Sequence, residues 1–232
     1  MTASSHPVLL LHGWGGSFAS AFDPYWTAPL QARGRSIIRM DLPGHGAGAS
    51  TDPEHYADLA SLVAARLPSE PLDAVGFSLG GKIVLALAAK KPSRFRRVVV
   101  GGVGDNAFAP EPSGEDLASA LIDPIGAAAS SQIVQLARYG IGNGNDPAAL
   151  AAVLRRPANP VLETAALALV GDTLVVNSTA DTIAMSDDRL CRALTRCRHV
   201  QVDAVGHLAL LDDRRFREAA IAFLQTTAEV DA

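Results

Sequence analysis

The sequence has few cysteines and no long apolar run. Its 232 residues include two cysteines, Cys191 and Cys197, whose separation of six positions matches neither a C-x-x-C motif nor a familiar metal-binding spacing. We therefore expect buried or incidental thiols rather than a disulfide or a metal site. No segment approaches the roughly 18 apolar residues of a membrane span, and residues 1–6 lack the features of a signal peptide. These absences predict a cytoplasmic protein without a membrane span.

The sequence also lacks a strong excess of charge of either sign. The formal net charge is −4, the isoelectric point is near 5.8, and charged residues make up 19% of the chain. Such a surface is unsuited to nucleic acid or to an anionic membrane as the main partner. Hydrophobic residues make up 48%, which is typical of a globular chain that buries a core. We therefore expect no nucleic-acid partner, and no pattern in the sequence indicates an oligomeric state.

Apolar runs alternate with helical patterns along most of the chain. Short apolar runs predict strands at residues 8–11, 36–40, 72–77, 97–103, 173–177 and 199–202. Helical patterns lie between or after them, at residues 24–33, 53–67, 79–90, 186–194 and 212–225. Alternation of this kind predicts an α/β fold, in which helices cover both faces of an open parallel sheet.

One long stretch, from about residue 104 to about residue 170, breaks this alternation. It is rich in alanine, glycine and proline and has no clear strand, and its helical patterns lie near residues 115–122, 127–139, 147–154 and 160–168. A structureless loop of this length is unusual inside a compact domain. We therefore predict a single domain over residues 1–232 with a short helical cap inserted at about 104–170.

The motif that carries most chemical information is Gly-Phe-Ser-Leu-Gly at residues 76–80. It reads G-x-S-x-G and lies between a predicted strand and a predicted helix. In this context the serine occupies a sharp turn, and its hydroxyl projects from the carboxyl edge of the sheet. Ser78 is therefore the candidate nucleophile.

A serine nucleophile needs a base and an acid that orients the base. His207 follows the last predicted strand and Asp181 follows the fifth, which gives the chain order Ser, Asp, His that this architecture uses. Because parallel strands end at one edge of the sheet, we expect Ser78, Asp181 and His207 to meet there. Asp105, after the fourth predicted strand, is the alternative acid.

An oxyanion hole would complete such a site, since the developing negative charge needs fixed N–H donors. The backbone N–H of Leu79 is one expected donor because it follows the nucleophile at the start of a helix. Residues 12–16 read His-Gly-Trp-Gly-Gly after the first predicted strand, and we predict the backbone N–H of Trp14 as the second donor. We expect His12 and His45 to brace loops rather than to transfer protons.

Taken together, these motifs resemble those of the α/β-hydrolase fold superfamily. The matching segments are residues 12–15, 41–46, 76–81, Asp181 and 206–207. The resemblance covers essentially the whole chain outside the cap, and it implies a Ser–His–Asp mechanism with a substrate pocket between sheet and cap. The sequence starts directly at the strand before residues 12–13, so it implies an N-terminally minimal version of the fold.

The resemblance implies an enzyme, a serine hydrolase that cleaves a carboxylic ester or thioester of a small, largely apolar acyl substrate through an acyl-enzyme. Apolar cap residues could line the pocket or pack the cap on the sheet: Phe108, Leu121, Ile122, Ile125, Ile133, Leu136, Tyr139 and Ile141. One alternative is a carbon–carbon bond hydrolase, or a lyase of the menaquinone-biosynthesis type, with the same triad and with basic residues near its pocket. Another is a non-catalytic ligand-binding protein. We expect no cofactor and no metal, because the sequence has no P-loop, no dinucleotide fingerprint and no metal-ligand cluster.

Overall fold

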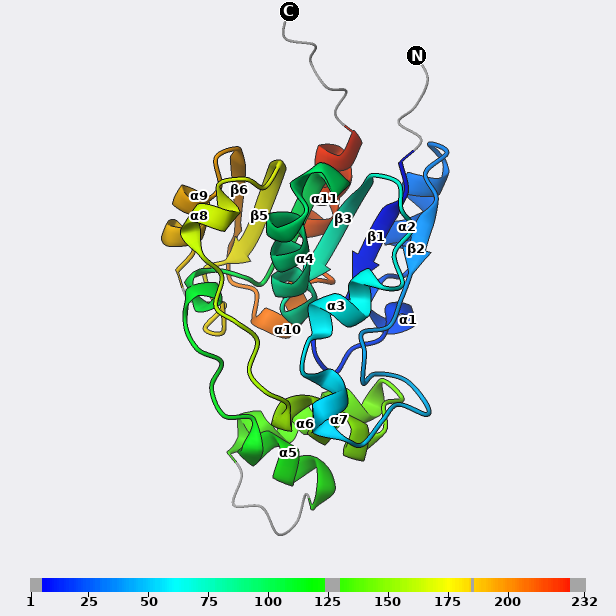
Figure 1. Cartoon of the computed structure of the whole chain (residues 1–232), viewed down its shortest axis with the longest axis vertical. Helices are drawn as coiled ribbons and strands as arrows, with labels where there is room; N and C mark the ends of the chain where they lie inside the picture. The colour runs from blue at the N-terminus through cyan, green and yellow to red at the C-terminus, as the bar shows by residue number, and fades with distance from the viewer. Residues whose placement is uncertain (1–5, 124–129, 185, 226–232) are drawn as a thin grey trace, which may run out of the picture.

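A parallel six-stranded sheet forms the centre of the computed structural model, which describes residues 6–123, 130–184 and 186–225 (Figure 1). The strand order within these residues is β2-β1-β3-β4-β5-β6, and every pair of neighbours is parallel. The strands are β1 (Val8–Leu11), β2 (Ile37–Arg39), β3 (Leu72–Phe77), β4 (Phe95–Gly101), β5 (Asp172–Ser178) and β6 (Cys197–Val202). The prediction of an open parallel α/β sheet is therefore confirmed.

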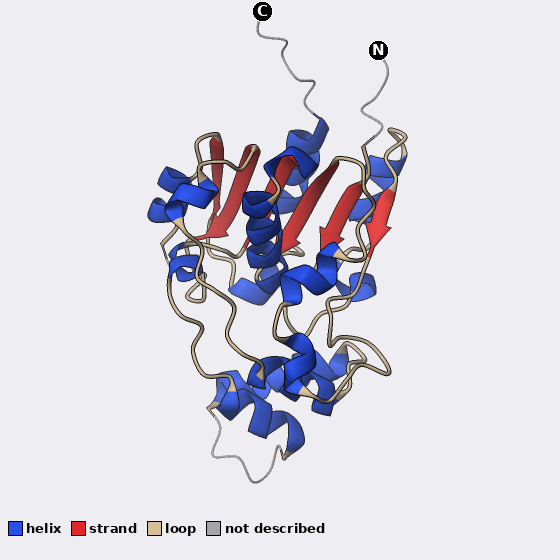
Figure 2. Ribbon diagram, in the orientation of Figure 1, coloured by secondary structure: helices blue, strands red, loops and turns tan. Residues whose placement is uncertain are grey.

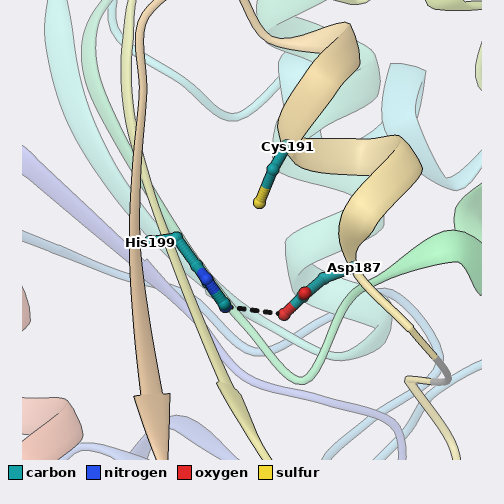
Figure 3. A group of neighbouring side chains, drawn as sticks. All are labelled: Asp187, Cys191 and His199. Atoms are coloured by element: carbon teal, nitrogen blue, oxygen red, sulfur yellow. Dashed lines mark ion pairs between the residues drawn. The ribbon is translucent and has the colours of Figure 1, made fainter.

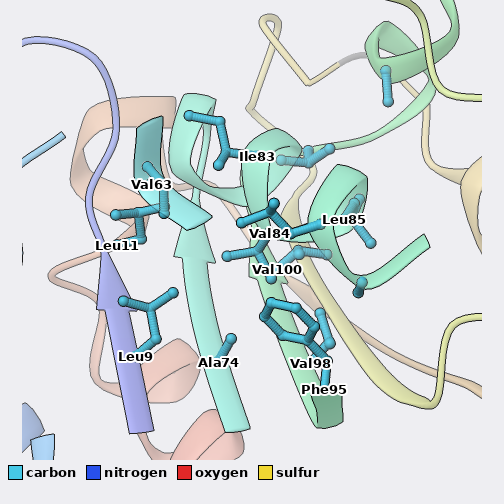
Figure 4. Packing of buried hydrophobic residues seen from close by; sticks show 14 of the residues in the cluster. Leu9, Leu11, Val63, Ala74, Ile83, Val84, Leu85, Phe95, Val98 and Val100 are labelled. Atoms are coloured by element: carbon cyan, nitrogen blue, oxygen red, sulfur yellow. The ribbon is translucent and has the colours of Figure 1, made fainter. Parts of the chain in front are cut away.

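Helices cover both faces of this sheet (Figure 2). One face carries α3 (Leu59–Ala64), α4 (Leu79–Lys90) and α9 (Asp188–Ala193), and the other carries α2 (Pro24–Gln31) and α11 (Arg214–Gln225). Successive side chains of a strand point to opposite faces. In β1, Leu9 and Leu11 therefore pack into the core under α3 and α4 (Figure 4). Val8 and Leu10 pack under α2 and α11.

The segment between β4 and β5 has helices joined by loops, and no strand, among its described residues. It contains η3 (Asp105–Phe108), α5 (Glu115–Ile122), α6 (Ser131–Gly142), α7 (Pro147–Arg155) and α8 (Thr164–Leu167). The helices α5, α6 and α7 lie together beyond the carboxyl ends of the strands, around a small apolar core of their own (Figure 1). The predicted helix at 127–139 begins outside the described residues, and α8 is shorter than the pattern at 160–168 suggests.

The helix predicted over residues 53–67 is divided into two elements. A 3-10 helix, η1 (Pro53–Tyr56), comes first, and α3 starts afresh after Asp58. The carboxylate of Asp58 accepts hydrogen bonds from the backbone N–H of Ser61 at 2.8 Å and from its hydroxyl at 2.6 Å. This side-chain cap supplies the acceptor that a new helix needs at its first turn, so it fixes the second start.

Several short helices have no counterpart in the sequence prediction. They are α1 (Phe18–Ala21), η2 (Pro92–Arg94), η3 and α10 (His207–Leu210). Segments of three or four residues are too short to show a 3.6-residue apolar period, so the sequence pattern could not reveal them. Among the described residues, no helix combines the length and the apolar character that crossing a membrane requires.

A buried charge cluster lies at the amino edge of the sheet. Asp73 in β3 is fully buried, and its carboxylate accepts a hydrogen bond of 2.5 Å from the guanidinium of Arg35. The other carboxylate oxygen accepts from the backbone N–H of Arg97 at 3.1 Å. Both guanidinium groups also donate to the carbonyl oxygen of Leu224, near the end of α11. The cluster therefore ties the last helix to the sheet.

We expect Asp73→Ala to destabilise the fold by about 3–5 kcal/mol, because it leaves the Arg35 guanidinium buried without its partner. The free energy of unfolding from urea titrations measures this loss. The matched control is Arg196→Ala, which removes the exposed pair of Arg196 with Asp172 at 2.7 Å. An exposed pair contributes at most about 1 kcal/mol. Equal losses in the two variants would contradict the assignment of Asp73 as a stabilising buried partner.

Candidate active site

Ser78 occupies a strained turn between β3 and α4. Its backbone has φ 51° and ψ −118°, a positive φ that non-glycine residues rarely adopt. The turn is tight because helix and strand approach closely: a Cβ on Gly76 would lie 2.6 Å from the carbonyl oxygen of Gly80. A Cβ on Gly80 would collide with the backbone oxygens of Leu11 and His12. The two glycines of the motif are thus required by the packing around Ser78.

The three residues predicted to form a triad lie in hydrogen-bonding contact. Nε2 of His207 is 2.9 Å from Oγ of Ser78, and Nδ1 of His207 is 2.7 Å from Oδ2 of Asp181. Ser78 follows β3, Asp181 follows β5, and His207 begins α10 after β6. A proton on Nδ1 that is donated to Asp181 leaves the lone pair of Nε2 facing the serine hydroxyl. This is the arrangement in which an imidazole can accept the hydroxyl proton.

Asp181 is buried and is held by its own loop. Its Oδ1 accepts hydrogen bonds from the backbone N–H groups of Ile183 at 2.9 Å and Ala184 at 3.0 Å. Burial alone would raise the pKa of this carboxyl, but the hydrogen bond from His207, the charge of a protonated His207 and the two N–H groups outweigh burial. The pKa of Asp181 therefore lies below its ordinary value, and the carboxylate stays charged beside the imidazole.

Asp105, the alternative acid, lies elsewhere. One of its carboxylate oxygens accepts a hydrogen bond of 3.0 Å from the backbone N–H of Leu190, in the first turn of α9. The carboxylate of Asp105 therefore accepts a hydrogen bond at the first turn of α9. Asp181 is the carboxylate in contact with His207.

The two predicted oxyanion donors flank Ser78. Gly13 packs directly against the nucleophile, since a Cβ at this position would lie 3.1 Å from Cβ of Ser78. Among the described residues, neither the backbone N–H of Trp14 nor that of Leu79 donates to another protein atom. β1 lies between β2 and β3, so the chain reverses its direction across the sheet here, and loops that diverge at such a point form a crevice. The two N–H groups therefore lie in the loop after β1 and at the start of α4, next to this point of the sheet.

Two histidines brace the loop that carries Trp14. Nε2 of His45 accepts from the backbone N–H of Gly15 at 2.9 Å, and Nε2 of His12 accepts from the backbone N–H of Leu42 at 3.0 Å. Burial lowers the pKa of His45 to about 3, so this ring is neutral and can act as an acceptor. Loop bracing was the role predicted for both side chains, and their contacts are of that kind.

Sequence reasoning missed Asn145, which joins the same loop to the helical insertion. Its amide nitrogen donates to the carbonyl oxygens of Gly15 and Gly140, both at 2.9 Å, and its Oδ1 accepts from the backbone N–H of Gly46 at 2.8 Å. The side chain is buried. No sequence signal marks it, because an asparagine in a Gly- and Asn-rich turn is ordinary, and Gly15 and Gly46 are about a hundred residues or more away in the sequence.

The apolar residues predicted to line the pocket fall into different environments. Tyr139 packs against Gly15 and Gly16 beside the candidate oxyanion loop, and Leu121 is buried in the core of the insertion. Ile122 and Ile141 are 55% and 41% exposed, and Ile125 lies outside the described residues. Tyr139 therefore lies next to the loop that carries Trp14.

A cavity of about 900 Å³ lies between α3, α4 and the two ends of the insertion. Its walls include Lys82, Ala107 and Leu162, but not Ser78, Asp181 or His207. This space is therefore separate from the residues that could perform chemistry.

Comparison with known proteins identifies related sequences and folds. The family model described as the alpha/beta hydrolase family matches residues 8–219. A pimeloyl-[acyl-carrier protein] methyl ester esterase of Aromatoleum aromaticum is 38% identical over 120 residues, which cover 46% of this chain and 44% of the relative. A 2-hydroxymuconate semialdehyde hydrolase of Pseudomonas sp. is 32% identical over 112 residues, which cover 46% and 40%. The matched segments thus span less than half the length of these curated relatives.

One similar solved structure is that of an esterase from Rhodococcus sp. ECU1013. It has a TM-score of 0.69 and 20% sequence identity, and the superposition covers 96% of this chain and 91% of that chain. At this level of identity, the likeness establishes a shared fold.

Proposed function

Since the chain belongs to the α/β-hydrolase family, we propose that it is a serine hydrolase that cleaves a carboxylic ester or thioester of a small, largely apolar acyl substrate. The observation that carries this proposal is the position of His207. One ring nitrogen lies 2.9 Å from Ser78 Oγ, and the other lies 2.7 Å from Asp181. A hydroxyl, a base and an acid in this order can generate a nucleophile at neutral pH.

In the proposed reaction, Oγ of Ser78 attacks the acyl carbonyl carbon while Nε2 of His207 takes the hydroxyl proton. The carbonyl oxygen becomes negatively charged, and the backbone N–H groups of Trp14 and Leu79 stabilise it. The tetrahedral adduct then expels the alcohol or thiol, which receives the proton from His207. A water molecule, deprotonated by His207, releases the acid from the serine by the same steps in reverse. Asp181 keeps the imidazole in the tautomer that this cycle requires.

We propose that α5, α6 and α7 form a cap that shapes the acyl pocket. They lie beyond the edge of the sheet at which Ser78 is placed (Figure 1). The ring of Trp14 supports this role because it packs against both the core under α4 and the core of the insertion. A substitution in the cap core would thus alter the packing of Trp14, whose backbone N–H is a predicted oxyanion donor.

The substrate we favour is an acyl ester without a charge close to the cleaved bond. Two arginines of the insertion that could bind an acidic group are already paired: Arg155 with Glu115 at 2.6 Å and Arg156 with Glu111 at 2.8 Å. The methyl ester named for the esterase relatives is of this neutral kind at its reacting end. Carbon–carbon bond hydrolysis is the second candidate, because a relative carries the name of a semialdehyde hydrolase.

Hydrolysis of p-nitrophenyl esters, from acetyl to decanoyl, tests whether the protein cleaves esters or carbon–carbon bonds. We expect clear turnover with an optimum at short or medium acyl chains, and kcat/KM at least tenfold above that for a vinylogous diketone with a carboxylate. The reverse ranking would favour the carbon–carbon hydrolase. Binding of the acyl products without turnover of either class would instead indicate a ligand-binding protein.

A further inference from the structure

A second group of reactive side chains lies between α9 and β6, outside the candidate active site. Nε2 of His199 is 2.8 Å from Oδ2 of Asp187. Together with the sulfur of Cys191, these donor atoms all lie within 4.8 Å of one another. Figure 3 shows the three side chains converging, with Cys191 on the helix and His199 on the strand facing it.

The thiol of Cys197 lies near this group. Asp187 precedes α9 and Cys191 lies one turn later, so the two share a face of the helix. Cys197 and His199 are two residues apart on β6, so they share a face of the strand. The thiols of Cys191 and Cys197 are neighbours, but the sulfur of Cys197 lies outside the group of donor atoms that are within 4.8 Å of one another. The facing surfaces of helix and strand thus present a carboxylate, two thiols and an imidazole.

We propose that Asp187, Cys191, Cys197 and His199 form a binding site for Zn²⁺. Two sulfurs, one nitrogen and one oxygen are a ligand set that suits tetrahedral zinc, because thiolate and imidazole select this ion over Mg²⁺ or Ca²⁺. Bonds of about 2.0–2.3 Å place tetrahedral donors roughly 3.3–3.8 Å apart. The observed spread of up to 4.8 Å among Asp187, Cys191 and His199 therefore requires the sulfur of Cys191 to move inward and the 2.8 Å contact of Asp187 with His199 to open slightly. The sulfur of Cys197 must also turn toward these three donors, since it lies outside their group. Binding releases both thiol protons to solvent, and Nε2 of His199 gives up any proton it shares with Asp187 so that its lone pair can bind the ion.

Asn177 forms a hydrogen bond with one of the proposed ligands, Asp187. Its Nδ2 donates to Oδ2 of Asp187 at 2.9 Å and to the carbonyl oxygen of Val103 at 2.8 Å. Such a contact orients a ligating carboxylate. The segment between Asn177 and Asp187 also carries Asp181, so a bound ion would fix the far end of the loop that holds the candidate catalytic acid.

Titration of the full chain with Co²⁺, a coloured substitute for Zn²⁺, tests the site under reducing conditions. Cys191 and Cys197 are the only cysteines in the sequence, so any thiolate-to-cobalt absorption band must come from them. We expect one ion per chain, a thiolate band, and displacement of Co²⁺ by Zn²⁺. Bound Zn²⁺ should also slow alkylation of both thiols. Absence of stoichiometric binding, or binding without the thiolate band, would overturn the proposal.

Variants locate the ion among the four residues. Cys191→Ser, Cys197→Ser and His199→Ala should each weaken binding at least about tenfold, and Asn177→Ala should weaken it by about tenfold through Asp187. The control is Asp172→Asn, which alters an exposed carboxylate paired with Arg196 and should leave affinity unchanged. Circular dichroism confirms that each variant is folded. Undiminished affinity in a folded Cys191→Ser/Cys197→Ser double variant would reject the site, and Ser78→Ala should bind Zn²⁺ normally whether or not the chain is an esterase.

Discussion

Ser78→Ala should lower kcat for ester hydrolysis by about 10⁵–10⁶-fold, because the proposed mechanism has no other nucleophile. The residual rate would come from substrate binding and from the N–H groups of Trp14 and Leu79, which the substitution leaves in place. Steady-state kinetics with the best p-nitrophenyl ester measures the loss. Burst kinetics with the unaltered protein would report the acyl-enzyme that the same serine forms.

Two controls separate chemistry from folding in this experiment. Alanine is subject to much the same backbone strain as serine at the positive φ of residue 78, so thermal unfolding should be nearly unchanged. Ser61→Ala removes a hydroxyl that is hydrogen-bonded to Asp58 at 2.6 Å, away from the site, and should retain full activity. A folded Ser78→Ala protein with near wild-type turnover would rule out the scheme.

Asp181→Asn should lower kcat by about 10⁴-fold. The amide oxygen can still accept from Ile183 and Ala184, so the loop keeps its shape. The amide nitrogen would then face Nδ1 of His207 and donate to it, which favours the tautomer with the proton on Nε2. In that state the ring cannot accept the proton of Ser78. The substitution therefore tests orientation of the base with little change in volume.

The matched control for this prediction is Asp105→Asn. Asp105 is the other acid that follows a strand, and the structure places it on the backbone N–H of Leu190 rather than on His207. An asparagine can still accept that hydrogen bond, so we expect less than about a tenfold change in kcat. If Asp105→Asn proved the more damaging of the two, the assignment of Asp181 as the orienting acid would be wrong.

Strands and helices with strong local patterns were predictable from the sequence. The bounds of β1, β3, α4 and α5 agree with those expected, because continuous apolar runs or clear helical periods define them. The sequence pattern placed the start of β6 at residue 199, two residues too late. This edge strand begins at Cys197 and carries exposed polar residues such as Arg198 and Gln201. A search for apolar runs therefore finds only its second half.

The contents of the candidate sites were predictable to different degrees. The G-x-S-x-G motif and the chain order of Ser, Asp and His suffice to select three side chains that the structure places in contact. Asn145 and the group around Asp187 could not be found in this way, because their partners lie on other elements. The separation of Cys191 and Cys197 has no metal-site signature, since one thiol is on a helix and the other on a facing strand.

The distance between nucleophile and base along the chain has a consequence for the order of folding. Ser78 and His207 are 129 residues apart, and β4 and β5 lie between the strands that precede them in the sheet, β3 and β6. Their contact can therefore close only after β4, β5 and β6 have paired in register. Pairing between distant parallel strands forms slowly during folding. Recovery of catalytic activity would thus report the completion of the sheet rather than its nucleation.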